Sequence, residues 1–438
     1  MILRSRQLLA VAGAIGALSL GVAACGDDEG SSDSGDSGEG GAASLDLVIG
    51  DSLPLSGDLA DFGPPGQKAA DLALAEIQSA IDESGADHTV EIVHEDNGGG
   101  ADPQAAVQAA RKLVSSDGAS CIAGAWASSD TIPTAESVAI PEEVILISPS
   151  STSDEITGLD DDGYVARTSP ADIFQGPTLA DAVAEDLGGA EGMVVNIAGR
   201  NDAYGKGLAT VFREAWEGQG GEIGEEVLYD PKLPSYDTEA EQITGNDPDA
   251  TVIFDFPETF NKVGPALVRT GNFDTSTTWV TDGLKSSDLA EGAGDEAVNG
   301  IRGTAPGSPD EGEASTAFDE LFTSSEPNDV DRQTFDSQNF DAVILCYLAA
   351  VASGSTEGSD MVESLQDVSG PGGDKYTWAE LPEAIEALEN GDDIDYEGAS
   401  GPVDLDENGD PTAGVYDIFE YIDGVDEVVD EVPVATTE

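Results

Sequence analysis

Basic residues are scarce in this sequence. Only 16 Lys and Arg residues stand against 89 Asp and Glu residues, and the formal net charge is -73. A charge of this sign repels nucleic acids and anionic lipid headgroups, so both are excluded as partners. The acids are spread along the whole chain, which predicts a hydrated, halophilic acidic surface suited to high salt. Attraction of cationic ligands is the alternative, but it needs a more focused field.

Histidine and cysteine are also scarce, with two His and three Cys residues. No group of these residues has metal-ligand spacing, and no Gly-rich phosphate loop is present, so we expect neither a metal nor a cofactor. Cys25 ends an apolar segment, which leaves Cys121 and Cys346 as the only possible intramolecular pair. We favour two buried free thiols for that pair, and a disulfide is the alternative that export would permit.

Residues 1–25 have the pattern of a secretory signal. Arg4 and Arg6 precede an uncharged segment, 8–24, which is shorter than the roughly 20 apolar residues of a spanning helix. The segment ends in Val-Ala-Ala before Cys25, and this ending resembles the lipobox of bacterial lipoproteins. The resemblance implies cleavage before Cys25 and lipid attachment to its sulfur atom, which would anchor the chain to a membrane. A plain signal peptide with an incidental cysteine is the alternative.

Residues 26–44 consist almost wholly of Gly, Ser, Ala, Asp and Glu, which predicts a flexible acidic tether. From residue 45 onward, short β-rich segments alternate with helical patterns, and no further segment long and apolar enough to span a membrane is expected. Such alternation predicts βαβ units and a parallel sheet that is covered on both faces. The strands are expected at 45–52, 88–95, 121–125 and 144–148, and the helices at 66–81, 103–114 and 129–139.

The same alternation then starts again and predicts a second sheet. Its strands are expected at 192–198, 250–256 and 278–281, with helices at 204–217 and 258–270. Helical patterns follow at 315–323, 339–352 and 378–389, and the last strands are expected at 401–405 and 414–421, around an Asn-Gly turn at 408–409. Two sheets imply an α/β protein with two lobes.

Two motifs suggest chemistry that the rest of the chain does not support. Gly-Asp-Ser-Leu at 50–53 looks like the nucleophile block of the GDSL-type serine esterases. A nucleophilic serine needs a histidine base, but His88 and His94 both lie in or beside the second predicted strand. The segment 404–409 copies the opening of an EF-hand loop, yet its twelfth position is Val415 where a bidentate Glu is required. We therefore expect no enzymatic activity and no metal site.

Small hydroxyl residues follow two neighbouring strands of the first predicted sheet. Trp126-Ala127-Ser128-Ser129-Asp130-Thr131 comes after one strand, and Ser148-Pro149-Ser150-Ser151-Thr152 comes after the next. Open α/β sheets bind ligands at the carboxyl ends of their strands, and hydroxyl and backbone N–H groups there suit an anion. Two such loops side by side predict a carboxylate site, and an ordinary Ser helix cap is the alternative for the first loop.

The order of these motifs resembles the type I periplasmic binding proteins of ABC transporters, particularly the leucine/isoleucine/valine-binding branch. The resemblance covers residues 45–421 and implies two Rossmann-like lobes joined by a hinge of three crossings. Its motifs are Ser-Gly at 56–57, Phe-Gly at 62–63, Ala-Ser-Ser at 127–129, Ile-Ser-Pro at 147–149, Arg-Thr at 167–168, Gln-Gly at 175–176, Tyr-Gly-x-Gly at 204–207, Phe-Asp-Ala at 340–342 and Tyr-Glu-Gly-Ala-Ser-Gly-Pro at 396–402.

The resemblance also implies a role for several residues. The groups that hold a ligand carboxylate fall on Ser128, Ser150 and Thr152, with Ser129 beside them. The acid that pairs with the ligand ammonium falls on Asp282, where the family more often has a residue one methylene longer. A second acid falls on Asp172 and a cleft tyrosine on Tyr204. Phe62 stands where tyrosine is common, Trp126 replaces a small aliphatic residue, and Phe256 and Phe335 are further candidate walls, although ordinary core packing explains each aromatic residue equally well.

From these expectations we predict an extracytoplasmic solute-binding lipoprotein that captures an amino acid, of the branched-chain kind, for a membrane ABC permease. Hinge closure would bury the ligand, and we expect a monomer. An extracellular sensor for amides, urea or aromatic acids is the alternative, and the esterase is a distant one. We expect the first lobe to comprise residues 45–170 and 304–395, and the second lobe 171–303 and 396–438.

Overall fold

The computed structural model describes residues 44–309 and 312–436. The predicted leader, Cys25 and nearly all of the predicted tether lie outside the described residues, so those predictions stay untested.

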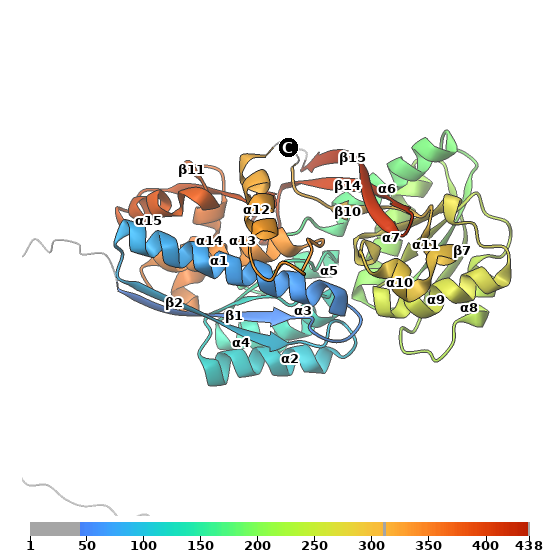
Figure 1. The fold of residues 1–438 in the computed structure, drawn as a ribbon. Coiled ribbons are helices and arrows are strands. Elements are labelled where there is room, and N and C mark those ends of the chain that lie inside the picture. Colours follow the sequence, from blue (N-terminus) through green and yellow to red (C-terminus); the bar gives the residue numbers. More distant parts are fainter. Residues whose placement is uncertain (1–43, 310–311, 437–438) are drawn as a thin grey trace, which may run out of the picture. The chain divides into compact units, whose positions relative to one another are not determined.

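Five strands form a fully parallel sheet in the order β2-β1-β3-β4-β5. Figure 1 shows β1 and β2 alongside helix α1 (Gly63–Ser84). Consecutive residues of a strand face opposite sides of the sheet. Leu47 and Ile49 of β1 pack in the core with helices α1 and α13 (Asp336–Ser353), whereas Val48 packs on the other side with helix α2 (Pro103–Lys112). The strand bounds are β1 Leu45–Leu53, β2 His88–Asp96, β3 Cys121–Ala123, β4 Ile145–Ser148 and β5 Val165–Arg167.

The helices around this sheet begin and end where the local sequence requires. Helix α1 has prolines in its first turn and ends at Gly85, whose φ of 75° is readily adopted only by glycine. Helix α2 follows the cap Asp102, which accepts a hydrogen bond from the backbone N–H of Gln104. The helices and turns are α1 Gly63–Ser84, α2 Pro103–Lys112, η2 Leu113–Asp117, α3 Ser128–Thr134, η3 Ala135–Ala139, α4 Ile140–Glu142, α5 Asp154–Thr157, α12 Glu313–Ser324, α13 Asp336–Ser353, α14 Gly358–Ser369, η6 Trp378–Glu380 and α15 Leu381–Glu389.

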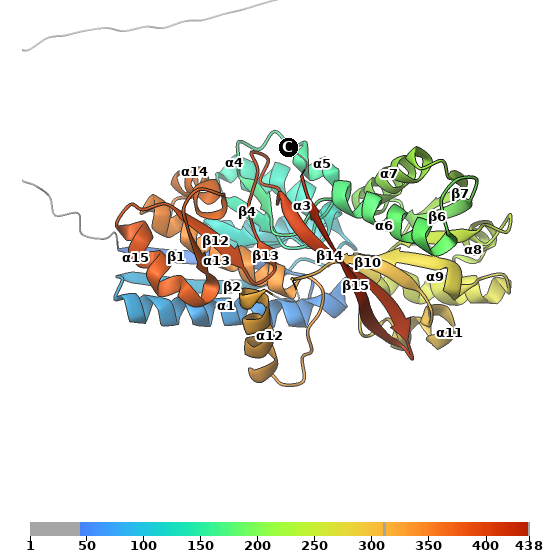
Figure 2. The same ribbon diagram turned by 90° about the horizontal axis from the view of Figure 1, so that it is seen from above.

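A second sheet has seven strands in the order β15-β14-β10-β9-β8-β6-β7. Five of them are parallel, and β14 and β15 form an antiparallel hairpin that lies beside β10 (Figure 2). The strands are β6 Val194–Arg200, β7 Glu222–Tyr229, β8 Ala250–Phe254, β9 Thr278–Thr281, β10 Arg302–Pro306, β14 Ala413–Ile422 and β15 Val425–Ala435. Its helices and turns are α6 Asp172–Leu187, α7 Ala203–Gly218, α8 Asp237–Ile243, α9 Pro257–Thr270, η4 Thr275–Thr277, η5 Asp282–Leu284, α10 Leu289–Ala293 and α11 Asp295–Val298.

The two sheets confirm the predicted α/β fold with two lobes, but the end of the chain differs from the predicted hairpin. A small sheet of β11 (Asp374–Thr377), β12 (Ile394–Gly398) and β13 (Gly401–Pro402) precedes β14. Strand β13 pairs with β12, and β14 pairs with β10 and β15, so the expected strands 401–405 and 414–421 do not pair with each other.

The sheet order bears on where one lobe ends and the other begins. Strand β10 pairs within the seven-stranded sheet, and Tyr396, Val403 and Leu405 pack in the core of the first lobe. We therefore propose boundaries near residues 170, 307 and 412, in place of 170, 303 and 395.

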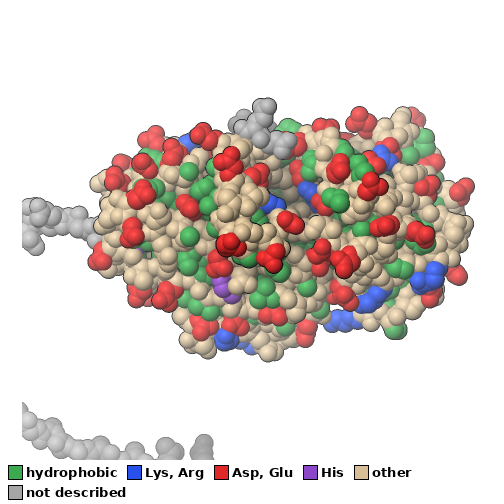
Figure 3. Space-filling model, in the orientation of Figure 1, with side chains coloured by type: hydrophobic (Ala, Val, Ile, Leu, Met, Phe, Trp, Pro, Cys, Tyr) green, Lys and Arg blue, Asp and Glu red, His purple; other side chains and the backbone are tan. Residues whose placement is uncertain are grey.

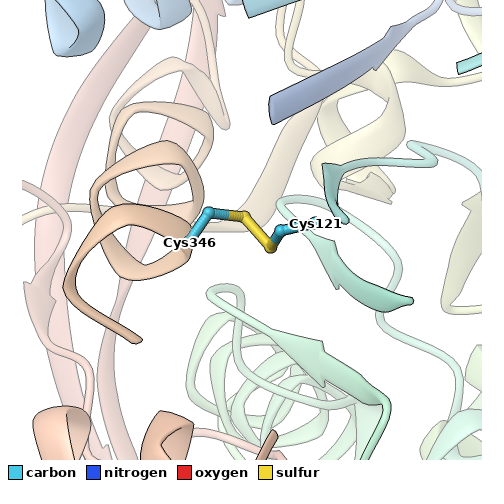
Figure 4. Close-up of a disulfide and its surroundings, with 2 residues drawn as sticks. All are labelled: Cys121 and Cys346. Atoms are coloured by element: carbon cyan, nitrogen blue, oxygen red, sulfur yellow. A yellow bond between two sulfur atoms is a disulfide. The ribbon is translucent and has the colours of Figure 1, made fainter. Parts of the chain in front are cut away.

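Cys121 in β3 and Cys346 in α13 form a disulfide, with 5.8 Å between their Cα atoms (Figure 4). The expectation of two free thiols is therefore wrong. A sequence separation of 225 residues gives no sign of proximity, whereas the packing of α13 on this face of the sheet brings the two side chains together.

The surface and the longest helices agree with the charge and hydropathy of the sequence. Acidic side chains are spread over the face in Figure 3, with few Lys and Arg side chains between them. Among the described residues no single helix has the length and hydrophobicity to cross a membrane. Helices α13 and α14 reach that threshold only together, across a bend of 107°, and α13 is buried in the core of the first lobe.

Candidate functional site

A cavity lies where strand ends of both lobes meet. The loops after β1, β3 and β4 reach it from the first lobe, and the loops after β6, β8 and β9 reach it from the second, as expected for parallel sheets. The volume open to the centre of a water molecule is only about 10 Å³, so the two lobes are closed upon it. Its lining consists of Leu59, Phe62, Trp126, Ala127, Ser128, Ser150, Tyr204, Phe256, Asp282, Gly283 and Phe335.

Hydrogen bonds join the two serine loops of the first lobe. The hydroxyl group of Ser150 donates to the carbonyl oxygen of Trp126 at 2.7 Å, and that of Ser148 donates to the carbonyl oxygen of Ala125 at 2.6 Å. The Ser128 hydroxyl oxygen accepts from the backbone N–H of Ser153 at 3.3 Å. The O–H of Ser128 therefore remains able to donate to a carboxylate in the cavity.

Asp282 supplies the charge on the other side of the cavity. It follows β9 and is 2% exposed, and its Oδ1 accepts a hydrogen bond from the Tyr204 hydroxyl group at 3.2 Å. The Tyr204 oxygen in turn accepts from the backbone N–H of Gly283 at 3.1 Å. Burial raises the pKa of Asp282 to about 7, although hydrogen bonds from Gln175 and Tyr204 oppose that rise. An ammonium group beside Asp282 would favour its ionised form.

Asp172, Ser129 and Thr152 do not line the cavity. Asp172 begins α6, and neither oxygen of its buried carboxyl group has a hydrogen-bond partner among the described residues. Its backbone N–H donates to the carbonyl oxygen of Thr152 at 2.8 Å, which places the two residues together. Burial raises the pKa of Asp172 well above its usual range, and the nearby Asp154 and Asp282 act in the same direction. These three residues stay predictions as ligand contacts.

Aromatic rings from both lobes form most of the apolar wall. Tyr204 and Phe256 pack with ring centroids 4.7 Å apart in the second lobe, and Phe62 and Phe335 pack at 6.5 Å in the first. The sequence did not identify Leu59, Ala127 or Gly283 as lining residues. Ala127 and Gly283 lie next in sequence to Trp126, Ser128 and Asp282, so adjacency was the signal that could have found them.

The geometry also decides against the serine esterase. The Nδ1 atom of His94 lies 2.7 Å from a carboxyl oxygen of Asp51, and its Nε2 atom lies 3.1 Å from one of Asp71. Both ring nitrogens are therefore hydrogen-bonded to carboxyl groups. Burial lowers the pKa of His94, but these two partners outweigh it and raise the pKa to about 10. A histidine held in its charged form cannot serve as the base for Ser52.

The segment that resembles an EF-hand opening forms a turn. Oδ1 of Asp406 accepts from the backbone N–H groups of Asn408 and Asp410 at 2.8 and 3.1 Å. Within residues 44–309 and 312–436 no group of three or more His, Cys, Asp or Glu side chains is placed to hold a metal ion.

Comparison with known proteins decides the family. The model of the family described as periplasmic binding protein matches residues 46–421. The chain belongs to this family. Its members are non-enzymatic binding proteins, so this chain is a solute-binding protein and not an enzyme.

Three similar proteins are informative about this periplasmic binding protein. It is 28% identical over 373 residues to the chemotactic signal transduction system substrate-binding protein BasB of Halobacterium salinarum, covering 84% of this chain and 85% of that one. A branched-chain amino acid transporter substrate-binding protein from Streptococcus pneumoniae, solved with isoleucine, has a TM-score of 0.72 at 23% identity, covering 89% of this chain and 99% of that one. A solute-binding protein from R. palustris, solved with 4-hydroxybenzoate, has a TM-score of 0.69 at 19% identity, covering 88% and 97%.

Proposed function

We propose that this periplasmic binding protein captures an α-amino acid between its lobes and delivers it to an ABC permease. The observation that carries the proposal is the position of Ser128 and Ser150 on one lobe and Asp282 on the other, around one cavity. The O–H group of Ser128 is free to donate to a carboxylate, whereas that of Ser150 donates to the Trp126 carbonyl oxygen and holds the loop in place. The acid on the other lobe suits an ammonium group, so the site is arranged for a zwitterion.

The strength of such a site is sufficient for capture. Hydrogen bonds to charged groups contribute roughly 1.5–3 kcal/mol each, and a micromolar complex requires about 8 kcal/mol. The surrounding apolar walls supply further binding energy when the lobes close and exclude water. Branched-chain amino acids are the first ligands to test, since the S. pneumoniae protein was solved with isoleucine.

We further propose that the mature chain begins at Cys25, is lipid-anchored outside the cytoplasmic membrane through that residue, and acts as a monomer. In this proposal the ligand contacts include Ser129, Thr152 and Asp172 besides the cavity residues. The apolar leader and the residues around Cys25 support the anchor.

A second candidate function is sensing. The similarity to BasB, whose name assigns it to a chemotactic signal transduction system, favours a receptor partner in place of a permease. In that case the closed form would be recognised by a signalling protein, and the cavity would serve the same ligand chemistry. The structure solved with 4-hydroxybenzoate favours testing aromatic acids beside amino acids.

A solute screen tests the proposed function. Thermal unfolding of the purified protein is measured with leucine, isoleucine, alanine, glycine, urea, acetamide and 4-hydroxybenzoate. A rise in Tm with one or more amino acids, confirmed by calorimetry, is the expected result, because a ligand that binds only the folded state stabilises it. Stabilisation by 4-hydroxybenzoate or urea with no amino acid effect would contradict the proposal.

A further inference from the structure

Trp126 is the largest side chain in the cavity wall, and its position is set by a glycine on α1. The indole is 2% exposed and its benzene edge lies against Gly66. A Cβ atom on residue 66 would lie 2.4 Å from Cζ2 and 2.7 Å from Cη2 of Trp126. The slot that receives the indole therefore exists only because residue 66 has no side chain.

The slot is rigid on both sides. Residue 66 lies in the first turns of α1, whose start carries prolines, and Leu53 of β1 also lies within 3.2 Å of the position that a Cβ of residue 66 would take. The carbonyl oxygen of Trp126 accepts hydrogen bonds from Ser150 and Ser151, at 2.7 and 3.1 Å. Backbone and side chain of Trp126 are thus both fixed, so the indole cannot move aside easily for a ligand.

The polar groups of the cavity define which part of a zwitterion faces Trp126. Ser128 and Ser150 lie toward the carboxylate, and Asp282 lies toward the ammonium group. Apart from Tyr204 and Gly283, the other lining residues have apolar side chains. The side chain of a bound amino acid must lie among these apolar side chains. Trp126 has the largest side chain in that region, so it takes up space that a long ligand side chain would need.

We propose that Trp126, seated against Gly66, is a specificity-determining residue that restricts this site to amino acids with small side chains, of the size of alanine, and disfavours leucine and isoleucine. The inference rests on the proposed amino-acid function and narrows its ligand class.

The test compares glycine, alanine, valine and leucine by calorimetry on the full-length protein and on two variants. The wild type is expected to bind alanine at least about tenfold more tightly than leucine, whose side chain is larger by three carbon atoms, since one methylene group in a confined pocket already changes affinity by about tenfold or more. Trp126→Leu removes the indole but keeps an apolar wall. It should strengthen leucine binding by about tenfold, so that the preference for alanine over leucine falls.

Gly66→Ala is the second variant, because it displaces the indole without altering any lining residue. It should weaken alanine binding in the wild-type background and have little effect in the Trp126→Leu background, which is the coupling expected of residues in contact. If Trp126→Leu folds poorly, Gly66→Ala in the wild-type background still tests the inference, because unchanged alanine binding there would contradict it.

The outcomes are distinguishable. Tighter binding of leucine than of alanine by the wild type, or an unchanged ratio of alanine to leucine affinity in Trp126→Leu, would overturn the inference and leave the proposed function standing. Binding of 4-hydroxybenzoate or urea with no amino acid binding would overturn both.

Discussion

The guanidinium group of Arg200, at the end of β6, lies 2.8 Å from the carboxylate of Asp58, in the loop after β1. The side chain of Arg200 is fully buried, and this pair joins the two lobes directly. Arg200 also bonds to Asp202 at 2.7 Å in its own lobe and lies 4.2 Å over the ring of Phe256, which lines the cavity. A ligand that contacts Phe256 would therefore contact the residue that packs against Arg200, whose ion pair with Asp58 holds the lobes together.

Asp58→Asn should shift the protein toward an open form. The change keeps the size of the side chain but removes the charge that Arg200 faces across the lobes. Because Asp202 still pairs with Arg200, we expect a loss of about 1.5 kcal/mol in ligand binding, roughly tenfold in Kd. Calorimetry measures the affinity, and small-angle scattering of the ligand-free protein measures the opening.

The matched control for Asp58→Asn is Asp237→Asn. Asp237 pairs with Arg269 on the surface, and both side chains are more than half exposed. Such pairs contribute little, so this variant should bind like the wild type. Equal affinities for Asp58→Asn and Asp237→Asn would show that the Arg200–Asp58 pair does not stabilise the closed form.

The two sides of the site should respond differently to ligand chemistry. Asp282→Asn should weaken an α-amino acid by roughly 1.5–3 kcal/mol more than its des-amino analogue, since only the former carries an ammonium group. Ser128→Ala should weaken both ligands alike, because both carry a carboxylate. Equal losses of the two ligands with Asp282→Asn would mean that this acid does not recognise an ammonium group.

Ligand binding near pH 7 should release protons. Burial raises the pKa of Asp282 to about 7, so part of the population is protonated before binding, and an ammonium ligand requires the carboxylate. Affinity should therefore rise between pH 6 and pH 8, and the calorimetric enthalpy should depend on the ionisation enthalpy of the buffer. Asp130 and Asp255 also have pKa values raised by burial to about 7, so Asp282→Asn, which should abolish the buffer dependence, is the necessary control.

The same shift has a consequence for stability without ligand. The folded protein holds the proton of Asp282 more tightly than the unfolded chain, whose carboxyl group has the ordinary value of 3.8. Between these values the folded state binds more protons, so this group lowers stability as the pH rises from about 4 to 7. A smaller fall of Tm over this range in Asp282→Asn than in the wild type is the expected result.

Removal of the disulfide should destabilise the first lobe. Cys346→Ser should lower the free energy of unfolding by about 2–5 kcal/mol. Reducing agent should bring the wild type toward the Tm of the variant and leave the variant unchanged. A wild-type Tm that is insensitive to reductant would contradict a disulfide in the protein in solution.

The proposed anchor predicts a change of compartment. Cys25→Ala should release the protein from the membrane fraction, since the hydrophilic segment that follows has no other affinity for a bilayer. Ser31→Ala, in the same segment, should leave the protein membrane-bound. Retention of Cys25→Ala after a salt wash would exclude a lipid anchor at this residue.

Strands with continuous apolar segments could be predicted from the sequence, and so could the edge strand β2, but the two edge strands of the second sheet could not. Strand β4 is fully buried and was expected within one residue of its bounds, whereas β7 has four exposed positions, three of them glutamates, and was missed. Strand β15 was missed for the same reason, because nine of its eleven residues are acidic or exposed. An edge strand pairs on one side only, and where its residues are mostly exposed no hydrophobic pattern remains to be read.

The loops of the cavity could also be predicted, since parallel strands bring their carboxyl ends to one edge. The orientation of single side chains could not. Ser128 lines the cavity and Ser129 does not, because consecutive positions of a helix differ by about 100° in direction. Similarly, nothing in the local sequence indicated that Gly66 would receive the indole of Trp126, since the contact joins segments far apart in the chain.

The disulfide has a kinetic consequence for ligand capture. Cys121 lies in the strand that leads into Trp126 and Ser128, and Cys346 lies on α13, which begins directly after Phe335. The covalent bond therefore ties together two segments that form one half of the cavity, and this half is preorganised before any ligand arrives. We expect the ligand to dock first on the first lobe, at a rate set by diffusion and access, and the second lobe to follow. Residence time would then depend on how often the second lobe reopens.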